Sequence, residues 1–142
     1  MKSILIIGGT KFIGRMLVDK FIVDGYKITV FSRSTPKQNQ VNYIKGDRNN
    51  PNDLQNLIRT IQGNTYDRIY DMCCYEPDQA EKLAPILVKH TKKIILFSSA
   101  AVYEKSEIFP LNESSPLGEH PSFGDYGTKK AGVEAIYKKN CE

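Results

Sequence analysis

The chain has 142 residues, a net charge of +4 and an ordinary globular composition, with 40% hydrophobic and 25% charged residues. This length fits one domain, residues 1–142, with a sizeable core, and is too short for two such domains. There is no run of 18 apolar residues and no cationic leader with a cleavable apolar stretch, so we expect a cytoplasmic protein with no membrane partner.

The first predicted element is a buried strand from Ser3 to Ile7, followed by a glycine-rich turn and a helical pattern. This order is typical of the opening of a dinucleotide-binding unit. Gly8 would permit the tight turn, Gly14 would let helix and strand pack closely, and the amides between them would face a pyrophosphate. The alternative is a plain strand-to-helix turn. The predicted cofactor-binding residues here are Gly8, Gly9, Thr10, Lys11, Phe12, Ile13 and Gly14.

The second predicted strand, Lys27 to Phe31, leads to the position that usually selects the cofactor. A dinucleotide fold that prefers NAD places an acidic residue there, about 20 positions after the glycine turn, to bond the ribose 2′-hydroxyl. This chain has Ser32 and Arg33 instead. Because no carboxylate would repel a 2′-phosphate and a guanidinium could hold it, we predict a preference for NADP over NAD. The alternative is that Arg33 is only a surface cation in a turn.

Strands and helices continue to alternate along the chain. Further strands are predicted at Val41 to Ile44, Arg68 to Cys73 and Lys93 to Phe97. Asn50 and Pro51 would cap and start a second helix. A third helix is predicted from about Pro77 to Lys89, with Pro85 expected to kink it or displace its start. The alternation predicts an α/β fold, a doubly wound, Rossmann-like parallel sheet of about five strands with helices on both faces.

The last part of the chain combines a long loop with a tyrosine–lysine pair. Residues 104–125 contain three prolines and no sustained periodicity, which predicts a loop facing a substrate. In the helix predicted from Tyr126 to about Lys139, Tyr126 and Lys130 lie one turn apart on one face. The ammonium would lower the pKa of the phenol toward working pH.

The cysteines and histidines form no metal site or disulfide framework that we can identify. Cys73 and Cys74 are adjacent, Cys141 is nearly terminal, and His90 and His120 are far apart. We expect reduced thiols and no bound metal.

Three segments together resemble the extended short-chain dehydrogenase/reductase superfamily, whose best-known members are NAD-dependent nucleotide-sugar epimerases and dehydratases. They are GGTKFIG at residues 8–14, FSSAAVY at residues 97–103 and YGTKK at residues 126–130, in family order and spacing. The resemblance implies a catalytic site in which Tyr126 is the general acid/base, Ser99 bonds the same substrate oxygen, and Lys130 binds the nicotinamide ribose. The alternatives are that the serine caps a loop, the tyrosine is a packed aromatic and the lysine lies at the surface.

The resemblance assigns three more cofactor-binding positions. Asp47 matches the aspartate that approaches adenine, and Cys73 and Cys74 fall where the fourth strand passes the cofactor. Lys11 replaces a glycine of the family's turn, where it would either add a cation for the phosphates or push the dinucleotide away. With a non-glycine residue at this position, the chain is similar to an atypical branch of the superfamily. That branch includes chloroplast stem-loop-binding proteins, some of which act on RNA.

The resemblance therefore implies an NAD(P)-binding oxidoreductase-like domain acting on a nucleotide-linked sugar. The alternative is a regulatory or RNA-binding module that binds the cofactor without turnover, and a structural domain with no ligand is the third interpretation. Extended members continue well beyond Lys130 with more strands and a small substrate domain, so the chain resembles only their N-terminal portion. We expect turnover from the longer parent protein and none from this portion alone. The strand around Ile95 would be an exposed edge, which predicts a homo-oligomer.

Overall fold

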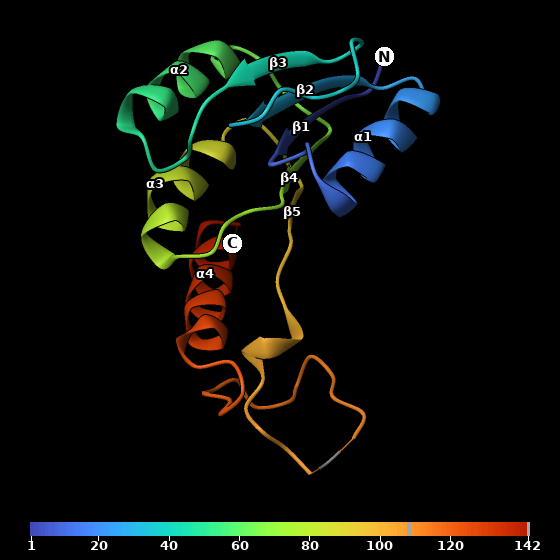
Figure 1. The fold of residues 1–142 in the computed structure, drawn as a ribbon. Helices are drawn as coiled ribbons and strands as arrows, with labels where there is room; N and C mark the ends of the chain where they lie inside the picture. The colour runs from blue at the N-terminus through green and yellow to red at the C-terminus, as the bar shows by residue number, and fades with distance from the viewer. Residues whose placement is uncertain (108, 142) are drawn as a thin grey trace.

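A computed structural model describes residues 1–107 and 109–141 of the chain. Five parallel strands form one sheet in the order β3-β2-β1-β4-β5, which confirms the predicted doubly wound fold (Figure 1). The strands are β1 (Ser3–Ile7), β2 (Lys27–Ser32), β3 (Asn42–Lys45), β4 (Arg68–Asp71) and β5 (Ile94–Leu96). The helices are α1 (Phe12–Val23), α2 (Pro51–Ile61), α3 (Pro77–Leu87), the short 3₁₀ helix η1 (Ala100–Val102) and α4 (Asp125–Cys141).

The two faces of the sheet are covered unequally. Alternate residues of β1 point to opposite faces, so Ile4 packs with α1, whereas Leu5 packs in a larger cluster with α2, α3 and α4. Both faces are apolar, which explains why the strands read as nearly continuous hydrophobic runs. The larger layer brings α4, late in the sequence, beside α3 and β5.

Helix boundaries follow the capping residues that the sequence predicts. The Asn50 side chain accepts hydrogen bonds from the amides of Asn52 and Asp53, and Pro51 occupies the first turn of α2. Gly25 follows α1 with a φ of +73°, a left-handed conformation that favours glycine. Helix α3 starts at the predicted residue and runs through Pro85, which lies near its exposed C-terminal end.

The strand order reverses beside β1, so β2 and β3 lie to one side and β4 and β5 to the other. Ligands of open parallel sheets bind in the crevice at the carboxyl ends of the strands at such a reversal. After η1, the described parts of residues 103–124 extend away from the sheet, largely without regular structure, as predicted (Figure 1). Within the described part of the chain, no helix has the length and hydrophobicity needed to span a bilayer.

Candidate functional site

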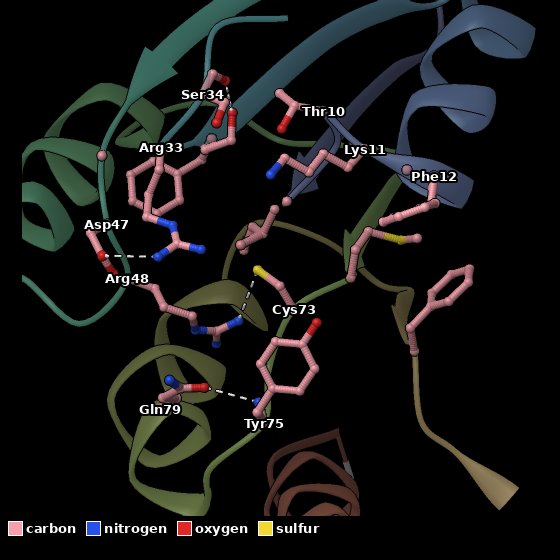
Figure 2. A pocket seen from close by; sticks show the side chains of 18 of the residues that line it. Thr10, Lys11, Phe12, Arg33, Ser34, Asp47, Arg48, Cys73, Tyr75 and Gln79 are labelled. Atoms are coloured by element: carbon pink, nitrogen blue, oxygen red, sulfur yellow. Dashed lines mark hydrogen bonds and ion pairs between the residues drawn. The ribbon is translucent and has the colours of Figure 1, made fainter.

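A cavity of about 550 Å³ lies at the carboxyl ends of the central strands (Figure 2). The glycine turn after β1 forms one wall, and the segments after β2 and β3 form another. The segment after β4 and the end of β5 close the remaining side, where Cys73, Tyr75 and Phe97 lie. The cavity therefore occupies the crevice that the strand order favours for a ligand.

The glycine turn requires two of its glycines for different reasons. Gly8 has a φ of +90°, and a Cβ built there would lie 2.8 Å from the sulfur of Cys73. Gly14 packs so closely that its Cβ would lie 2.8 Å from the Gly8 carbonyl oxygen. Gly9 does not line the cavity, because its α-carbon faces the core at Ile6. The remaining residues of the turn, Thr10 to Ile13, line the cavity together with Gly8 and Gly14.

A lysine fits at the fourth residue of the turn, position 11, without backbone strain. Lys11 has an extended backbone, with φ of −133° and ψ of 156°, which any residue can adopt. Figure 2 shows its ammonium directed into the cavity. The left-handed conformation instead falls on Phe12, with a φ of +44° and a side chain that is 88% exposed. The geometry supports Lys11 as an added cation in the cavity.

Cationic and hydroxyl groups gather at the end of the cavity beside β2. Arg33 is exposed and lies 3.8 Å from the carboxylate of Asp47, which follows β3. The Ser32 hydroxyl donates to the carbonyl oxygen of Ser34 at 2.8 Å, which shapes the turn around Arg33. Arg33 partly neutralises the carboxylate at this end of the cavity, so the local charge suits an anionic group.

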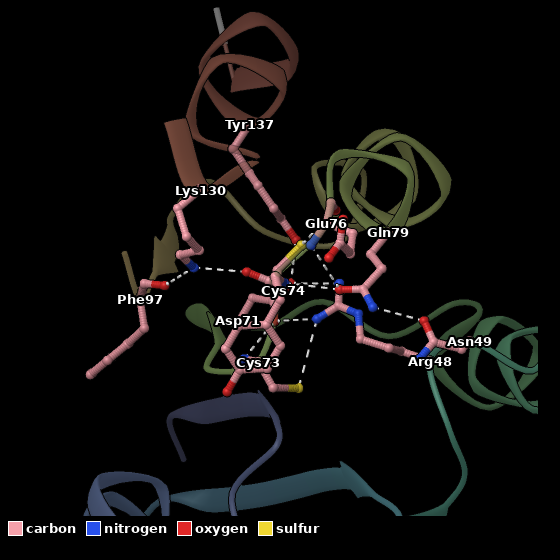
Figure 3. A network of polar contacts seen from close by, with 11 residues as sticks. Arg48, Asn49, Asp71, Cys73, Cys74, Glu76, Gln79, Phe97, Lys130 and Tyr137 are labelled. Atoms are coloured by element: carbon pink, nitrogen blue, oxygen red, sulfur yellow. Dashed lines mark hydrogen bonds and ion pairs between the residues drawn. The ribbon is translucent and has the colours of Figure 1, made fainter. Parts of the chain in front are cut away.

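Arg48, which lines the cavity next to this end, belongs to a buried ion pair (Figure 3). Arg48 donates from Nη1 and Nη2 to the two carboxylate oxygens of Asp71, at 2.7 and 3.0 Å, and both side chains are almost fully buried. Tyr137 of α4 donates to the same carboxylate at 2.6 Å. Burial opposes the charge on Arg48, but the Asp71 carboxylate outweighs it and raises the pKa of the guanidinium. This network ties the segment after β3 to β4 and α4.

The two adjacent cysteines have different surroundings. Cys73 is partly exposed and lines the cavity, whereas Cys74 is buried in the core and does not line it. Burial raises the pKa of the Cys73 thiol, and raises that of Cys74 to about 12. Both side chains are therefore protonated thiols at neutral pH.

Lys130 is held at the ends of two strands rather than at the surface. Its side chain is 2% exposed, and its ammonium donates to the carbonyl oxygens of Cys74 and Phe97 at 2.7 and 2.6 Å (Figure 3). The ammonium also lies 5.7 Å from the centre of the Tyr75 ring. Burial lowers the pKa of Lys130, and the carboxylates of Asp71 and Glu134 partly oppose this effect. The lysine lies directly behind the Tyr75 end of the cavity.

Like Lys130, the other two predicted catalytic residues lie outside the cavity lining. The Ser99 hydroxyl accepts a hydrogen bond from the Ala101 amide at 3.2 Å and so caps η1. Tyr126 lies in the first turn of α4 and is 38% exposed. The pKa of Tyr75 is raised, chiefly by burial and also by the nearby ionisable groups of Cys73 and Tyr126. Tyr75 thus lies between the cavity and the helix that carries Tyr126 and Lys130.

Sequence reasoning missed Arg48, Tyr75 and Gly127. A Cβ at Gly127 would lie 2.0 Å from the Ala101 carbonyl oxygen, so this glycine lets α4 approach η1 closely. The position of Gly127 between Tyr126 and Lys130 was the sequence feature that could have indicated this close packing. Within residues 1–107 and 109–141, no group of three metal-ligating side chains could hold an ion.

Comparison with known families gives a match over the first half of the chain. The sequence profile of the NAD dependent epimerase/dehydratase family matches residues 4–75, from β1 to the tyrosine after β4. A similar curated protein is the chloroplast stem-loop binding protein of 41 kDa b from Arabidopsis thaliana, which is 31% identical over 125 residues. That alignment covers 77% of this chain and 32% of the plant protein.

Solved structures share the fold at low sequence identity. The UDP-Glc/GlcNAc 4-epimerase of Campylobacter jejuni has a TM-score of 0.80 and 18% identity, covering 99% of this chain and 49% of that one. The UDP-glucose 4-epimerase of Thermotoga maritima, solved with UDP-glucose, has a TM-score of 0.79 and 21% identity, covering 97% and 50%. The dTDP-glucose 4,6-dehydratase of Bacillus anthracis, in complex with NAD, has a TM-score of 0.73 and 22% identity, covering 98% and 51%. The chain therefore spans about half the length of these structures and about a third of the plant relative.

Proposed function

The chain belongs to the NAD dependent epimerase/dehydratase family, and from this premise we propose that residues 1–142 form the dinucleotide-binding domain of a nucleotide-sugar epimerase, dehydratase or reductase. The observation that carries the proposal is the cavity at the glycine turn, with a cationic end and a buried lysine behind its other end. Structures with the same fold are described with UDP-glucose or with NAD, which supports this class of ligands.

The proposed cofactor would run from the cationic end of the cavity to Lys130. Its 2′-phosphate would lie at Arg33, with adenine toward Asp47, and its pyrophosphate would meet the amides after Gly8 and the Lys11 ammonium. Its remaining riboside would then reach the side of the cavity near Lys130. The residues fit such a group because the left-handed Gly8 and the extended Lys11 leave the centre of the cavity open.

The proposed catalytic roles fall on Ser99, Tyr126 and Lys130. Tyr126 would exchange a proton with a substrate oxygen, and Ser99 would bond the same oxygen through its hydroxyl. The Lys130 ammonium would contact the nicotinamide ribose. A nicotinamide would supply hydride transfer when bound, and these side chains would position the substrate and move its proton.

Separate titrations with NADPH and NADH test this proposal and the proposed preference for NADP. The intact chain should bind NADPH more tightly, and Arg33→Asp should lower NADPH affinity by about tenfold or more, because a charge-assisted bond to phosphate is lost. Arg59→Asp makes the same charge change on the exposed face of α2 and should have little effect. Equal, weak binding of both cofactors that ignores Arg33 would remove the NADP preference. Absence of binding would contradict the cofactor-binding role.

An RNA-binding module without turnover is the second candidate, favoured by the name of the plant relative and by a row of cations. Cations lie at the amino ends of four neighbouring strands, at the end of the sheet opposite the cavity. They are Lys27, Lys2, Arg68 and Lys93, in the order of the strands across the sheet. Strand spacing gives this row a length of about 14 Å. None of the three lysines forms an ion pair with another described residue, so their charges are available to phosphates.

A salt titration with a labelled RNA stem-loop tests this candidate. Because each neutralised phosphate releases counterions, removing three contacts should make the slope of log affinity against log salt shallower by about 2 to 3. The variant Lys2→Gln/Lys27→Gln/Lys93→Gln should show this change. A control of equal charge removes three exposed lysines elsewhere, Lys37, Lys105 and Lys139. Equal losses in both triple variants would mean non-specific attraction rather than a surface for RNA.

Self-association and a cytoplasmic location complete the proposal. Strand β5 pairs with β4 on one side, and beside it lies a partly apolar cavity of about 280 Å³ lined by Ile94, Leu96 and residues of α4. An unpaired strand edge favours pairing with another chain. Sedimentation velocity across a concentration series should show a dimer that Ile95→Lys weakens, and a concentration-independent monomer would contradict the proposed homo-oligomer.

A further inference from the structure

Tyr75 lines the cavity and also contacts Lys130. It follows β4 and is 49% exposed, although its ring is large and apolar. Figure 2 shows its hydroxyl directed into the cavity. Its ring centre lies 5.7 Å from the Lys130 ammonium, close enough for a cation–π contact. Tyr75 therefore connects the ligand space to a residue of the proposed catalytic site.

The backbone of Tyr75 is fixed by the start of α3. Its amide donates to the side-chain oxygen of Gln79 at 2.9 Å, and the same oxygen accepts from the Glu76 amide in the capping box. The Gln79 side-chain amide in turn donates to Asn49 at 2.7 Å, which joins the cap to the segment after β3. These bonds hold Tyr75 where its side chain enters the cavity, as a ligand-positioning group requires.

The opposite ends of the cavity differ in chemistry. Arg33 supplies charge at one end, whereas Tyr75, Met72 and Phe97 give the other end a mostly apolar lining with one hydroxyl. The raised pKa of Tyr75 keeps that hydroxyl protonated at neutral pH, so it can donate a hydrogen bond. An aromatic ring with a polar tip suits a flat heterocycle joined to a sugar. The charged half of a dinucleotide thus fits the Arg33 end and its ring-bearing half fits the Tyr75 end.

We propose that Tyr75 is a positioning residue for the nicotinamide of the dinucleotide, whose ring packs against the tyrosine ring and whose carboxamide oxygen accepts a hydrogen bond from the tyrosine hydroxyl. This inference rests on the proposed cofactor-binding function. It adds a residue outside the serine–tyrosine–lysine trio, placed so that a ligand stacked on Tyr75 lies next to Lys130.

The experiment compares two ligands that differ only in the nicotinamide. NADPH carries it, whereas 2′-phospho-ADP-ribose keeps the adenosine phosphate, pyrophosphate and second ribose. Calorimetric titration of the intact chain and of Tyr75→Leu with both should show NADPH affinity falling about tenfold, through lost stacking and hydrogen bonding. The affinity for 2′-phospho-ADP-ribose should change less than about twofold. Tyr75→Phe keeps the ring and should give an intermediate loss for NADPH.

Phe123→Leu is the matched control, because Phe123 is a 50% exposed aromatic residue outside the cavity. It should leave both affinities unchanged. A general loss of structure in Tyr75→Leu would lower the affinities for both ligands equally, so equal losses overturn the inference. Unchanged affinities for both ligands overturn it as well. If the intact chain binds neither ligand, the proposed function and this inference both fail. Normal binding that ignores Tyr75 defeats the inference alone.

Discussion

The cavity and the catalytic segment are built in different ways. The glycine-turn wall of the cavity takes its shape from a short stretch of sequence, in which Gly8 and Gly14 allow close approaches that a Cβ would block. The proposed catalytic segment consists of η1 and the first turns of α4. It depends on contacts between distant parts of the chain, namely Gly127 against Ala101 and Lys130 against the ends of β4 and β5. The geometry of the glycine turn is therefore largely local in sequence, whereas the geometry around the proposed catalytic residues depends on how α4 packs.

The network of Arg48, Asp71 and Tyr137 connects the two regions. Arg48 lines the cavity, Asp71 ends β4, and Tyr137 belongs to α4. Substitutions in this network should affect both regions. A substitution at Gly8 should mainly affect the cavity, and one at Gly127 should mainly affect the packing of α4 on η1.

Asp71→Asn should produce the largest loss of stability. It leaves the buried Arg48 charge without its carboxylate, and breaking a buried pair in this way costs about 3–5 kcal/mol. Urea unfolding should show this loss, together with weaker NADPH binding. Asp78→Asn breaks an exposed pair with Lys82 and should cost less than about 1 kcal/mol. Similar small costs for both variants would mean that the network does not join the regions.

Gly127→Ala should destabilise the catalytic segment although alanine is the better helix former. Helix propensity alone would stabilise α4 by about 1 kcal/mol. The new Cβ would instead meet the Ala101 carbonyl oxygen at 2.0 Å, and overpacking of this kind costs about 1–3 kcal/mol. Thermal unfolding shows whether the substitution stabilises or destabilises the protein. The free energy of NADPH binding should change less than the free energy of unfolding. A stabilised variant would contradict the close packing of α4 on η1, and Thr128→Ala on the exposed side of the helix is the control.

Gly8→Ala should reverse this pattern, with weaker NADPH binding and a modest loss of stability. The left-handed backbone costs an alanine about 1–2 kcal/mol, and the neighbouring Cys73 thiol must move. In Gly8→Ala/Cys73→Ala the thiol is gone, so part of the lost stability should return while the backbone strain stays. No recovery in a double-mutant cycle would mean that the turn and the segment after β4 are not in contact.

The sequence predicted the elements and their order because hydrophobic periodicity, glycine turns and caps are local signals. The parallel sheet, the Asn50 cap and the start of α3 at Pro77 were all readable in this way. The contacts of Lys130 with two strand ends were not, because they join residues 33 and 56 positions apart. The Arg48–Asp71 pair was missed because its residues are 23 positions apart and neither belongs to a recognisable motif.

Protection of Cys73 from alkylation would show that the cofactor binds in the cavity at the glycine turn. Cys73 lines the cavity, Cys141 is exposed and Cys74 is buried, so peptide mass spectrometry of iodoacetamide-treated protein compares the thiols in one sample. The raised pKa of Cys73 slows its basal reaction, which calls for a mildly alkaline buffer. At about ten times its dissociation constant, NADPH should slow alkylation of Cys73 by about tenfold and leave Cys141 unchanged. An unchanged Cys73 rate at a concentration where calorimetry shows saturation would place the dinucleotide elsewhere and contradict the account.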